Sequence, residues 1–161
     1  MKDEITHSQA MILFEQGYRQ HVQGKLSDAI ELYKRSIAIH PTAEAYTFLG
    51  WGYSMIGRLD DAIVMCEKAI EIDPTFGNPY NDIGAYKIEQ GKFAEAIPWL
   101  VEATTAPRYN SPQFAYMNLG RAHQNLGRYK TALDFYNQSL ALDPLYLPAE
   151  WAKTGLLAKM N

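Results

Sequence analysis

The side chains that could carry out chemistry are few in this chain of 161 residues, and they lie far apart. The four histidines are His7, His21, His40 and His123. None of them has a second histidine or a cysteine at the spacing of a metal site, so we predict no bound metal. The sequence also brings no nucleophile, base and orienting group together. We therefore expect a protein without catalytic activity and without a cofactor.

The single cysteine and two Gly-Lys pairs could suggest disulfide or phosphate chemistry, and neither is supported. Cys66 is the only cysteine, which excludes an internal disulfide and fits a reducing compartment. The pairs Gly24-Lys25 and Gly91-Lys92 look like part of a phosphate-binding loop. That motif needs four residues between its glycines and a serine or threonine after its lysine, whereas here six residues intervene and leucine or phenylalanine follows. Nucleotide binding is therefore not predicted.

The charge of the chain narrows the classes of partner. A formal net charge of −3 at pH 7 gives no general attraction to nucleic acid or to anionic membranes. Residues 1–105 hold 9 basic and 15 acidic side chains, whereas residues 106–161 hold 6 basic and 3 acidic ones. The basic third of the chain could favour an acidic partner at one end, although ordinary solvated helix faces explain the same charges.

Neither an export signal nor a membrane span is indicated by the sequence. The first seven residues carry charges of both signs and no apolar core. No segment approaches the roughly 20 apolar residues that a membrane helix needs. We expect a cytoplasmic protein that does not associate with membranes.

A pattern of fixed spacing recurs four times and decides which elements position these side chains. It has a glycine, a second glycine seven residues later and an alanine five residues after that. The glycine pairs are Gly17 and Gly24, Gly50 and Gly57, Gly84 and Gly91, and Gly120 and Gly127, and the alanines are Ala29, Ala62, Ala96 and Ala132. Apolar residues around them recur every three to four positions, the period of an α-helix. We predict a helical hairpin in each pattern, with the first glycine allowing close approach, the second ending a helix and the alanine packing at the crossing.

These residues resemble the tetratricopeptide-repeat (TPR) family, whose unit of about 34 residues has aromatic, Leu-Gly, alanine and closing proline positions. In repeat two the matching residues are Tyr46, Leu49, Gly50, Tyr53, Gly57, Ala62, Ala69 and Pro74. In repeat four they are Tyr116, Leu119, Gly120, Gly127, Ala132, Tyr136 and Pro144. The resemblance implies an all-α fold, a right-handed superhelical solenoid of four TPR helical hairpins plus a C-terminal capping helix.

The resemblance also implies how the chain is divided. We expect a single TPR domain over residues 1–161, with repeats at about 10–42, 43–76, 77–112 and 113–146 and the capping helix at about 147–160. In repeat four His123 replaces a family tyrosine, so we expect a core histidine with satisfied hydrogen bonds. Residues 77–84 and 96–100 look like small stand-alone bacterial TPR proteins of undefined role, which implies a bacterial source and an adaptor role.

In a TPR stack the first helix of each repeat lines a concave groove, where the resemblance implies that a peptide or protein segment binds. The candidate groove residues, rich in aromatic and amide side chains, are Phe14, Tyr18, Thr47, Trp51, Met55, Asn78, Asn81, Phe114, Met117, Asn118 and Arg121. Trp51 is either a platform for a ligand or is hidden by a neighbouring element. Asn81 and Asn118 could hold a peptide backbone, and Arg121 could pair with a carboxylate.

The groove positions do not favour the best-known TPR ligand, the C-terminal tail of a cytosolic chaperone. The clamp for that tail needs lysine, asparagine and arginine, and this chain has Phe14, Tyr18, Thr47, Trp51, Asn78 and Asp82 at the corresponding places. We therefore expect a non-catalytic protein-binding module or adaptor for a protein or peptide that the sequence does not identify. The alternative is a self-associating scaffold, a homo-oligomer with no separate peptide ligand.

Overall fold

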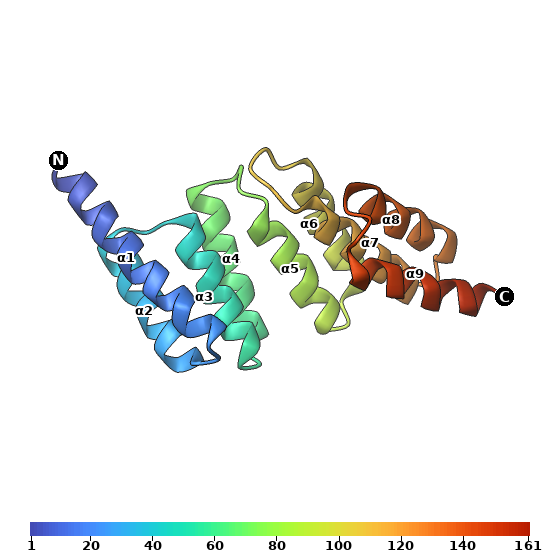
Figure 1. Ribbon diagram of the computed structural model, residues 1–161, viewed down its shortest axis with the longest axis horizontal. Coiled ribbons are helices and arrows are strands. Elements are labelled where there is room, and N and C mark those ends of the chain that lie inside the picture. Colours follow the sequence, from blue (N-terminus) through green and yellow to red (C-terminus); the bar gives the residue numbers. More distant parts are fainter. The chain divides into compact units, whose positions relative to one another are not determined.

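The computed structural model describes residues 1–161, and every regular element in it is an α-helix, which confirms the all-α class. The chain divides into two compact units, Met1–Pro74 and Thr75–Asn161, so the single domain expected over the whole chain stays a prediction. The first unit contains α1 (Lys2–Val22), α2 (Leu26–Ile39), α3 (Ala43–Met55) and α4 (Leu59–Ile72). The second contains α5 (Asn78–Glu89), α6 (Phe93–Thr105), α7 (Pro112–Asn125), α8 (Tyr129–Leu142) and α9 (Leu147–Met160). Figure 1 shows consecutive helices paired into hairpins within each unit.

The second glycine of each pattern ends a helix in the same way. Gly57 has a φ of 82°, a left-handed conformation that residues with a Cβ disfavour. The amide of Arg58 donates to the carbonyl of Tyr53 at 2.9 Å, and the amide of Gly57 donates to the carbonyl of Ser54 at 3.0 Å. This Schellman motif satisfies carbonyls that the helix end would otherwise leave unpaired. The turns at Gly24, Gly91 and Gly127 have φ values of 78°, 76° and 75°, so the turn prediction is confirmed.

The first glycine of each pattern lies where the two helices of a hairpin meet. A Cβ added to Gly120 would lie 2.3 Å from the ring of Tyr136, and one added to Gly17 would lie 2.8 Å from the ring of Tyr33. Both rings are buried, with exposed fractions of 1% and 0%. Glycine is therefore what allows α7 to approach α8, and α1 to approach α2, this closely. The alanines of the pattern are fully buried, as the spacing predicts: Ala29, Ala62, Ala96 and Ala132.

The core of the second unit connects α5 through α9. One cluster joins α5, α6 and α7 through buried residues that include Leu100 and Leu119. A second cluster joins Tyr136 of α8 with Leu156 of α9, and the half-buried Met117 of α7 packs against it. Because α5 contacts α7 and α7 contacts α9, the first helices of successive hairpins lie side by side in this unit. In the first unit, α1 contacts α3 in the same way.

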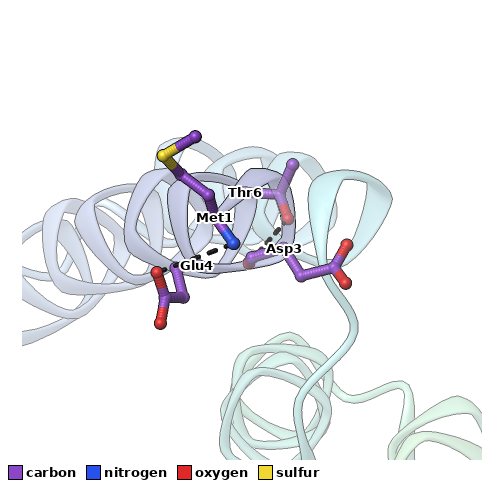
Figure 2. A network of polar contacts seen from close by, with 4 residues as sticks. All are labelled: Met1, Asp3, Glu4 and Thr6. Carbon is purple, nitrogen blue, oxygen red and sulfur yellow. Dashed lines mark hydrogen bonds and ion pairs between the residues drawn. The ribbon is translucent and has the colours of Figure 1, made fainter.

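Two helices of the first unit begin differently. α3 is capped by Thr42, whose side-chain oxygen accepts a hydrogen bond of 3.1 Å from a backbone amide of the first turn. α1 has no side-chain cap. The ammonium group of Met1 instead pairs with Glu4 at 3.7 Å, and the hydroxyl of Thr6 donates to the carbonyl of Asp3 at 2.9 Å. Figure 2 shows both contacts. Both partners of the ion pair are almost fully exposed, so it contributes little to stability.

Candidate functional site

An aromatic cluster lies on α1 and α3 of the first unit. The ring of Phe48 meets the rings of Phe14, Tyr18 and Trp51 edge to face, with centroid separations of 5.2, 5.6 and 5.7 Å. Such contacts favour one relative orientation of the rings. Tyr18 is 44% exposed, and the other three rings are half-buried. The structure therefore brings three predicted residues together around a fourth, with an exposed rim at Tyr18.

Trp51 packs on the imidazole of His21. The two rings stack with centroids 3.7 Å apart and planes inclined by 26°. His21 is 4% exposed, and its Nδ1 lies 3.1 Å from the hydroxyl of Tyr33. Its Nε2 is buried without a hydrogen-bond partner. Packing on a neighbouring helix is thus present for Trp51, and because the indole is only half-buried its role as a ligand platform stays a prediction.

The environment of His21 makes stability depend on pH. Burial lowers the pKa of His21 below its ordinary value because the charged ring would lose its hydration. The unfolded chain therefore binds a proton near pH 6.5 that the native state rejects, and stability falls as the pH drops through this range.

We expect His21→Gln to remove this pH dependence. Glutamine can replace the imidazole because Gln124, at the equivalent place in repeat four, accepts a hydrogen bond from Tyr136. Urea denaturation from about pH 7.5 to about pH 5 measures the free energies of unfolding of both proteins. As the pH falls, the wild type should lose stability relative to the variant. The difference between the two free energies of unfolding should change by at most about 1.4 kcal/mol per pH unit. A difference that is constant with pH would contradict the prediction.

The remaining predicted residues of the first unit differ in accessibility. Thr47 is 3% exposed, and its hydroxyl donates to the carbonyl of Ala43 at 2.7 Å. It therefore offers little surface to a partner. Met55, the last residue of α3, is 56% exposed and is available for contact.

A chain of polar side chains crosses from α5 to α7 in the second unit. Nδ2 of Asn118 donates to Oδ1 of Asn81 at 3.0 Å, and Nη1 of Arg121 donates to Oδ1 of Asn118 at 3.1 Å. Asn81 and Asn118 are 8% and 5% exposed, whereas Arg121 is half-buried. Buried amides that bond one another hold their neighbours in place, so the two asparagines orient the guanidinium. Contact of the asparagines with a peptide backbone stays a prediction.

A cavity of about 530 Å³ lies between α7 and α9. Met117, Arg121 and Gln124 line it from α7, and Trp151 and Lys159 line it from α9. Trp151 is 68% exposed. Ligand pockets in proteins commonly have volumes of about 300–1,000 Å³, so this cavity can hold a short stretch of side chains. Two of the predicted residues, Met117 and Arg121, meet here.

Tyr136 connects this cavity to the core. Its hydroxyl donates to Oε1 of Gln124 at 2.7 Å. Burial raises the pKa of Tyr136 to about 12, although the positive charge of Arg121 opposes the shift. The hydroxyl is therefore protonated at neutral pH and keeps Oε1 of Gln124 engaged. The amide NH2 group of Gln124 can donate to a ligand, and its Oε1 keeps a second lone pair.

The other predicted residues of the second unit lie outside this cavity. Asn78, the first residue of α5, lines a separate cavity of about 320 Å³ together with Arg108. Phe114 is 39% exposed, and its ring lies 5.1 Å from that of Tyr146. Because Phe114 precedes Met117 by three residues, the two side chains share one face of α7.

His123 differs from the prediction made for it. Its ring stacks on Phe135 with centroids 5.3 Å apart, so it packs as a core residue does. Its buried Nδ1 has no hydrogen-bond partner, so the satisfied bonding expected of it is wrong. Burial lowers the pKa of His123, and the charge of Arg128 lowers it further, which favours the neutral ring at neutral pH.

The predicted groove omits Phe48, Trp151 and Lys159. Phe48 precedes Trp51 by three residues, a spacing that places both rings on one side of a helix. Trp151 and Lys159 are eight residues apart, which places them on one face of α9. Spacing could therefore have found all three. Trp151 and Lys159 are absent from the prediction because groove positions were assigned only in the four repeats, which end before α9.

Neither a cluster of metal ligands nor a helix suited to a membrane is found. No group of three or more His, Cys, Asp and Glu side chains is arranged so that it could hold a metal ion. None of the helices combines the length and the apolar composition that crossing a membrane requires.

The sequence of the helical hairpins matches a known family. Two family models, both described as tetratricopeptide repeat, match residues 43–76 with 114–146 and residues 65–97, together more than half of the chain. This chain belongs to the tetratricopeptide-repeat family, and the predicted TPR solenoid fold is confirmed. The family assignment supports a general role as a protein-interaction module. No curated protein sequence matches the chain significantly.

Solved structures show the same fold. The chain is similar to pilF from Pseudomonas aeruginosa, with 21% identity and a TM-score of 0.88 over 96% of this chain and 70% of that one. PilW, described as a widely conserved type IV pilus biogenesis factor, is 22% identical with a TM-score of 0.84, over 93% and 70%. YrrB, described as a TPR protein with an unusual peptide-binding site, is 16% identical with a TM-score of 0.72, over 90% and 74%. At these identities the similarity establishes the fold alone.

Proposed function

We propose that this chain is a non-catalytic adaptor that binds a segment of another protein along the first helices of its hairpins. The observation that carries the proposal is the α7–α9 cavity, where an oriented Arg121 lies with Met117 and the exposed Trp151. Tryptophan and arginine are the side chains that most often dominate the energy of protein interfaces. The composition of this cavity is therefore suited to a partner's side chains.

The aromatic cluster of the first unit supports the same role. Tyr18 and Met55 present large accessible side chains on α1 and α3. The edge-to-face contacts of Phe48 hold the ring of Tyr18 before a partner arrives. A surface ordered in advance loses less conformational entropy on binding.

Photo-crosslinking from one face of the second unit tests the proposal. The crosslinking amino acid p-benzoylphenylalanine would replace Phe114, which is 39% exposed on α7 and precedes Met117, a residue of the cavity wall, by three positions. Val101, which is 45% exposed on α6, the second helix of its hairpin, is the matched control position. We expect crosslinks to a distinct protein from position 114, identified by mass spectrometry, and at least several-fold fewer from position 101. Equal yields from both positions, or none from either, would contradict the proposal.

Self-association is the second candidate function, and exposed apolar side chains around α9 favour it. Leu145, Leu147 and Trp151 are 86%, 55% and 68% exposed. Apolar side chains gathered at the end of a repeat array often mark a contact with another chain. Light scattering after size-exclusion chromatography separates the candidates. A stable dimer that Trp151→Ala dissociates supports the scaffold, and a monomer at every concentration rejects it.

A further inference from the structure

The α7–α9 cavity presents nitrogen donors with no acidic counter-charge. Arg121 lines it from α7 and Lys159 from α9, and no carboxylate lines it. Gln124, whose Oε1 accepts a hydrogen bond from Tyr136, also lines the cavity and adds its amide NH2 group as a donor. Two positively charged residues and a neutral donor therefore line one space, an arrangement that is complementary to an anion.

The guanidinium in this cavity is positioned before any ligand binds. Nη1 of Arg121 donates to Asn118, and Asn118 in turn donates to Asn81. Both asparagines are buried, so these bonds are shielded from competition with water. The remaining N–H groups of Arg121 form a planar fork, and this geometry matches the two oxygens of a carboxylate.

The place of Arg121 along the cavity indicates the kind of carboxylate. Met117 lies one turn before it on α7 and Asn125 one turn after it, and all three line the cavity. From Met117 to Asn125 the helix rises by about 12 Å, which is the length of three to four residues of an extended chain. Nδ2 of Asn125 donates to the carbonyl of Arg121 at 2.8 Å, so its Oδ1 is left to accept a peptide N–H. An extended segment can therefore continue past Arg121 in both directions. A carboxylate on an internal side chain needs this space on both sides, whereas the carboxylate at a chain terminus needs it on one side only.

The α9 wall offers an apolar contact and space beside these donors. Trp151 is 68% exposed and lines the cavity, so its ring can cover an apolar side chain of a ligand. A Cβ added to Gly155, which also lines the cavity, would meet no atom within 4 Å, so a peptide backbone can approach α9 there.

We infer that the α7–α9 cavity binds an acidic peptide segment, with an internal glutamate or aspartate side chain paired to Arg121 and Lys159 and a neighbouring apolar side chain packed on Trp151. The inference rests on the proposed protein-binding function and specifies its ligand. The excess of basic side chains in residues 106–161 adds a long-range attraction for such a segment.

Two-dimensional NMR of the full ¹⁵N-labelled chain tests the inference, because it detects binding with dissociation constants up to the millimolar range. The probe is a short acetylated and amidated peptide with two glutamates flanked by phenylalanine and leucine, and its matched control has glutamines in their place. We expect amide shifts to concentrate on α7 and α9 around Arg121 and Gly155. The glutamate peptide should bind at least about tenfold more tightly than the glutamine peptide, because hydrogen bonds to charged groups are the stronger ones.

Charge-neutralising variants assign the binding to the cavity. Arg121→Gln should weaken binding of the glutamate peptide at least about tenfold. Arg128→Gln, which neutralises an exposed arginine outside the cavity, should leave it unchanged. Thermal unfolding by circular dichroism checks that each variant is folded. Lys159→Gln, at the exposed end of α9, is the second variant if Arg121→Gln does not fold, and it should weaken binding as well.

Several outcomes overturn the inference. These are equal affinity for the two peptides, shifts located away from α7 and α9, and no shift at millimolar peptide. Tight binding that requires a free C-terminal carboxylate, tested with the same peptide without amidation, also overturns it because the ligand is then a chain terminus. If crosslinking from position 114 succeeds while the titrations fail, the protein-binding function stands and the acidic ligand is rejected. Failure of both rejects the function itself.

Discussion

Tyr136→Ala is expected to lower the free energy of unfolding of the second unit by about 3–5 kcal/mol, the range for removing a large aromatic side chain from a core. The ring is 1% exposed. It lies against Gly120 of α7 and packs with Leu156 of α9, so its loss leaves a space that three helices surround. Partial collapse can fill only some of that space, because each helix is held by its own neighbours. The variant also leaves Oε1 of Gln124 without its donor.

Tyr129→Ala is the matched control for this prediction. Tyr129 is the first residue of the same helix and is 39% exposed. Its removal should change the free energy of unfolding by no more than about 0.5 kcal/mol. Urea denaturation followed by circular dichroism measures both variants, and hydrogen exchange read by mass spectrometry locates the loss in α7–α9. Indistinguishable midpoints for the two variants would contradict the placement of Tyr136 in the core.

The helical hairpins could be predicted from the sequence because their requirements are local. Gly57 and Gly127 adopt a positive φ, which almost only glycine tolerates, so every repeat needs a glycine at this turn. Ala29 and its equivalents are fully buried where helices cross, so a larger side chain there would push the helices apart. Steric requirements of this kind fix residue type at one position, and their regular spacing then reveals the fold.

The asparagine pair shows where prediction from register stops. Asn81 and Asn118 lie on successive first helices near the predicted groove, and in the structure they bond one another and support Arg121. Whether two side chains meet depends on the distance and rotation between α5 and α7. Neither helix carries that information in its own sequence.

The α7–α9 cavity could be predicted least of all. Its walls come from residues 117–125, Tyr136 and residues 148–159, and a space between helices depends on which side chains are absent from it. Gly155 leaves such a space, and Trp151 acquires a role only because it borders that space. The sequence predicts a capping helix there, and its shape against α7 follows from packing in three dimensions.

Gly120→Ala is expected to destabilise the second unit by about 1–3 kcal/mol, even though alanine favours a helix over glycine by about 1 kcal/mol. The added Cβ would lie 2.3 Å from Cε1 and 2.4 Å from Cδ1 of Tyr136, closer than two carbon atoms can pack. The ring cannot move aside without loss, because it packs with Leu156 and its hydroxyl is bonded to Gln124. Either α7 separates from α8 or the ring leaves its rotamer, and both changes cost packing energy.

Gly155→Ala separates this steric effect from helix propensity. Gly155 is exposed in α9 and has open space around an added Cβ, so this variant should gain about 0.5–1 kcal/mol. In the Tyr136→Ala background, Gly120→Ala should cost little or nothing further, because the ring that it meets is gone. Urea denaturation of the wild type, Gly120→Ala, Tyr136→Ala and the variant with both changes completes this double-mutant cycle, and Gly155→Ala is measured beside it. If Gly120→Ala stabilises the chain as Gly155→Ala does, or adds its full cost to Tyr136→Ala, α7 and α8 do not meet at Gly120 in solution.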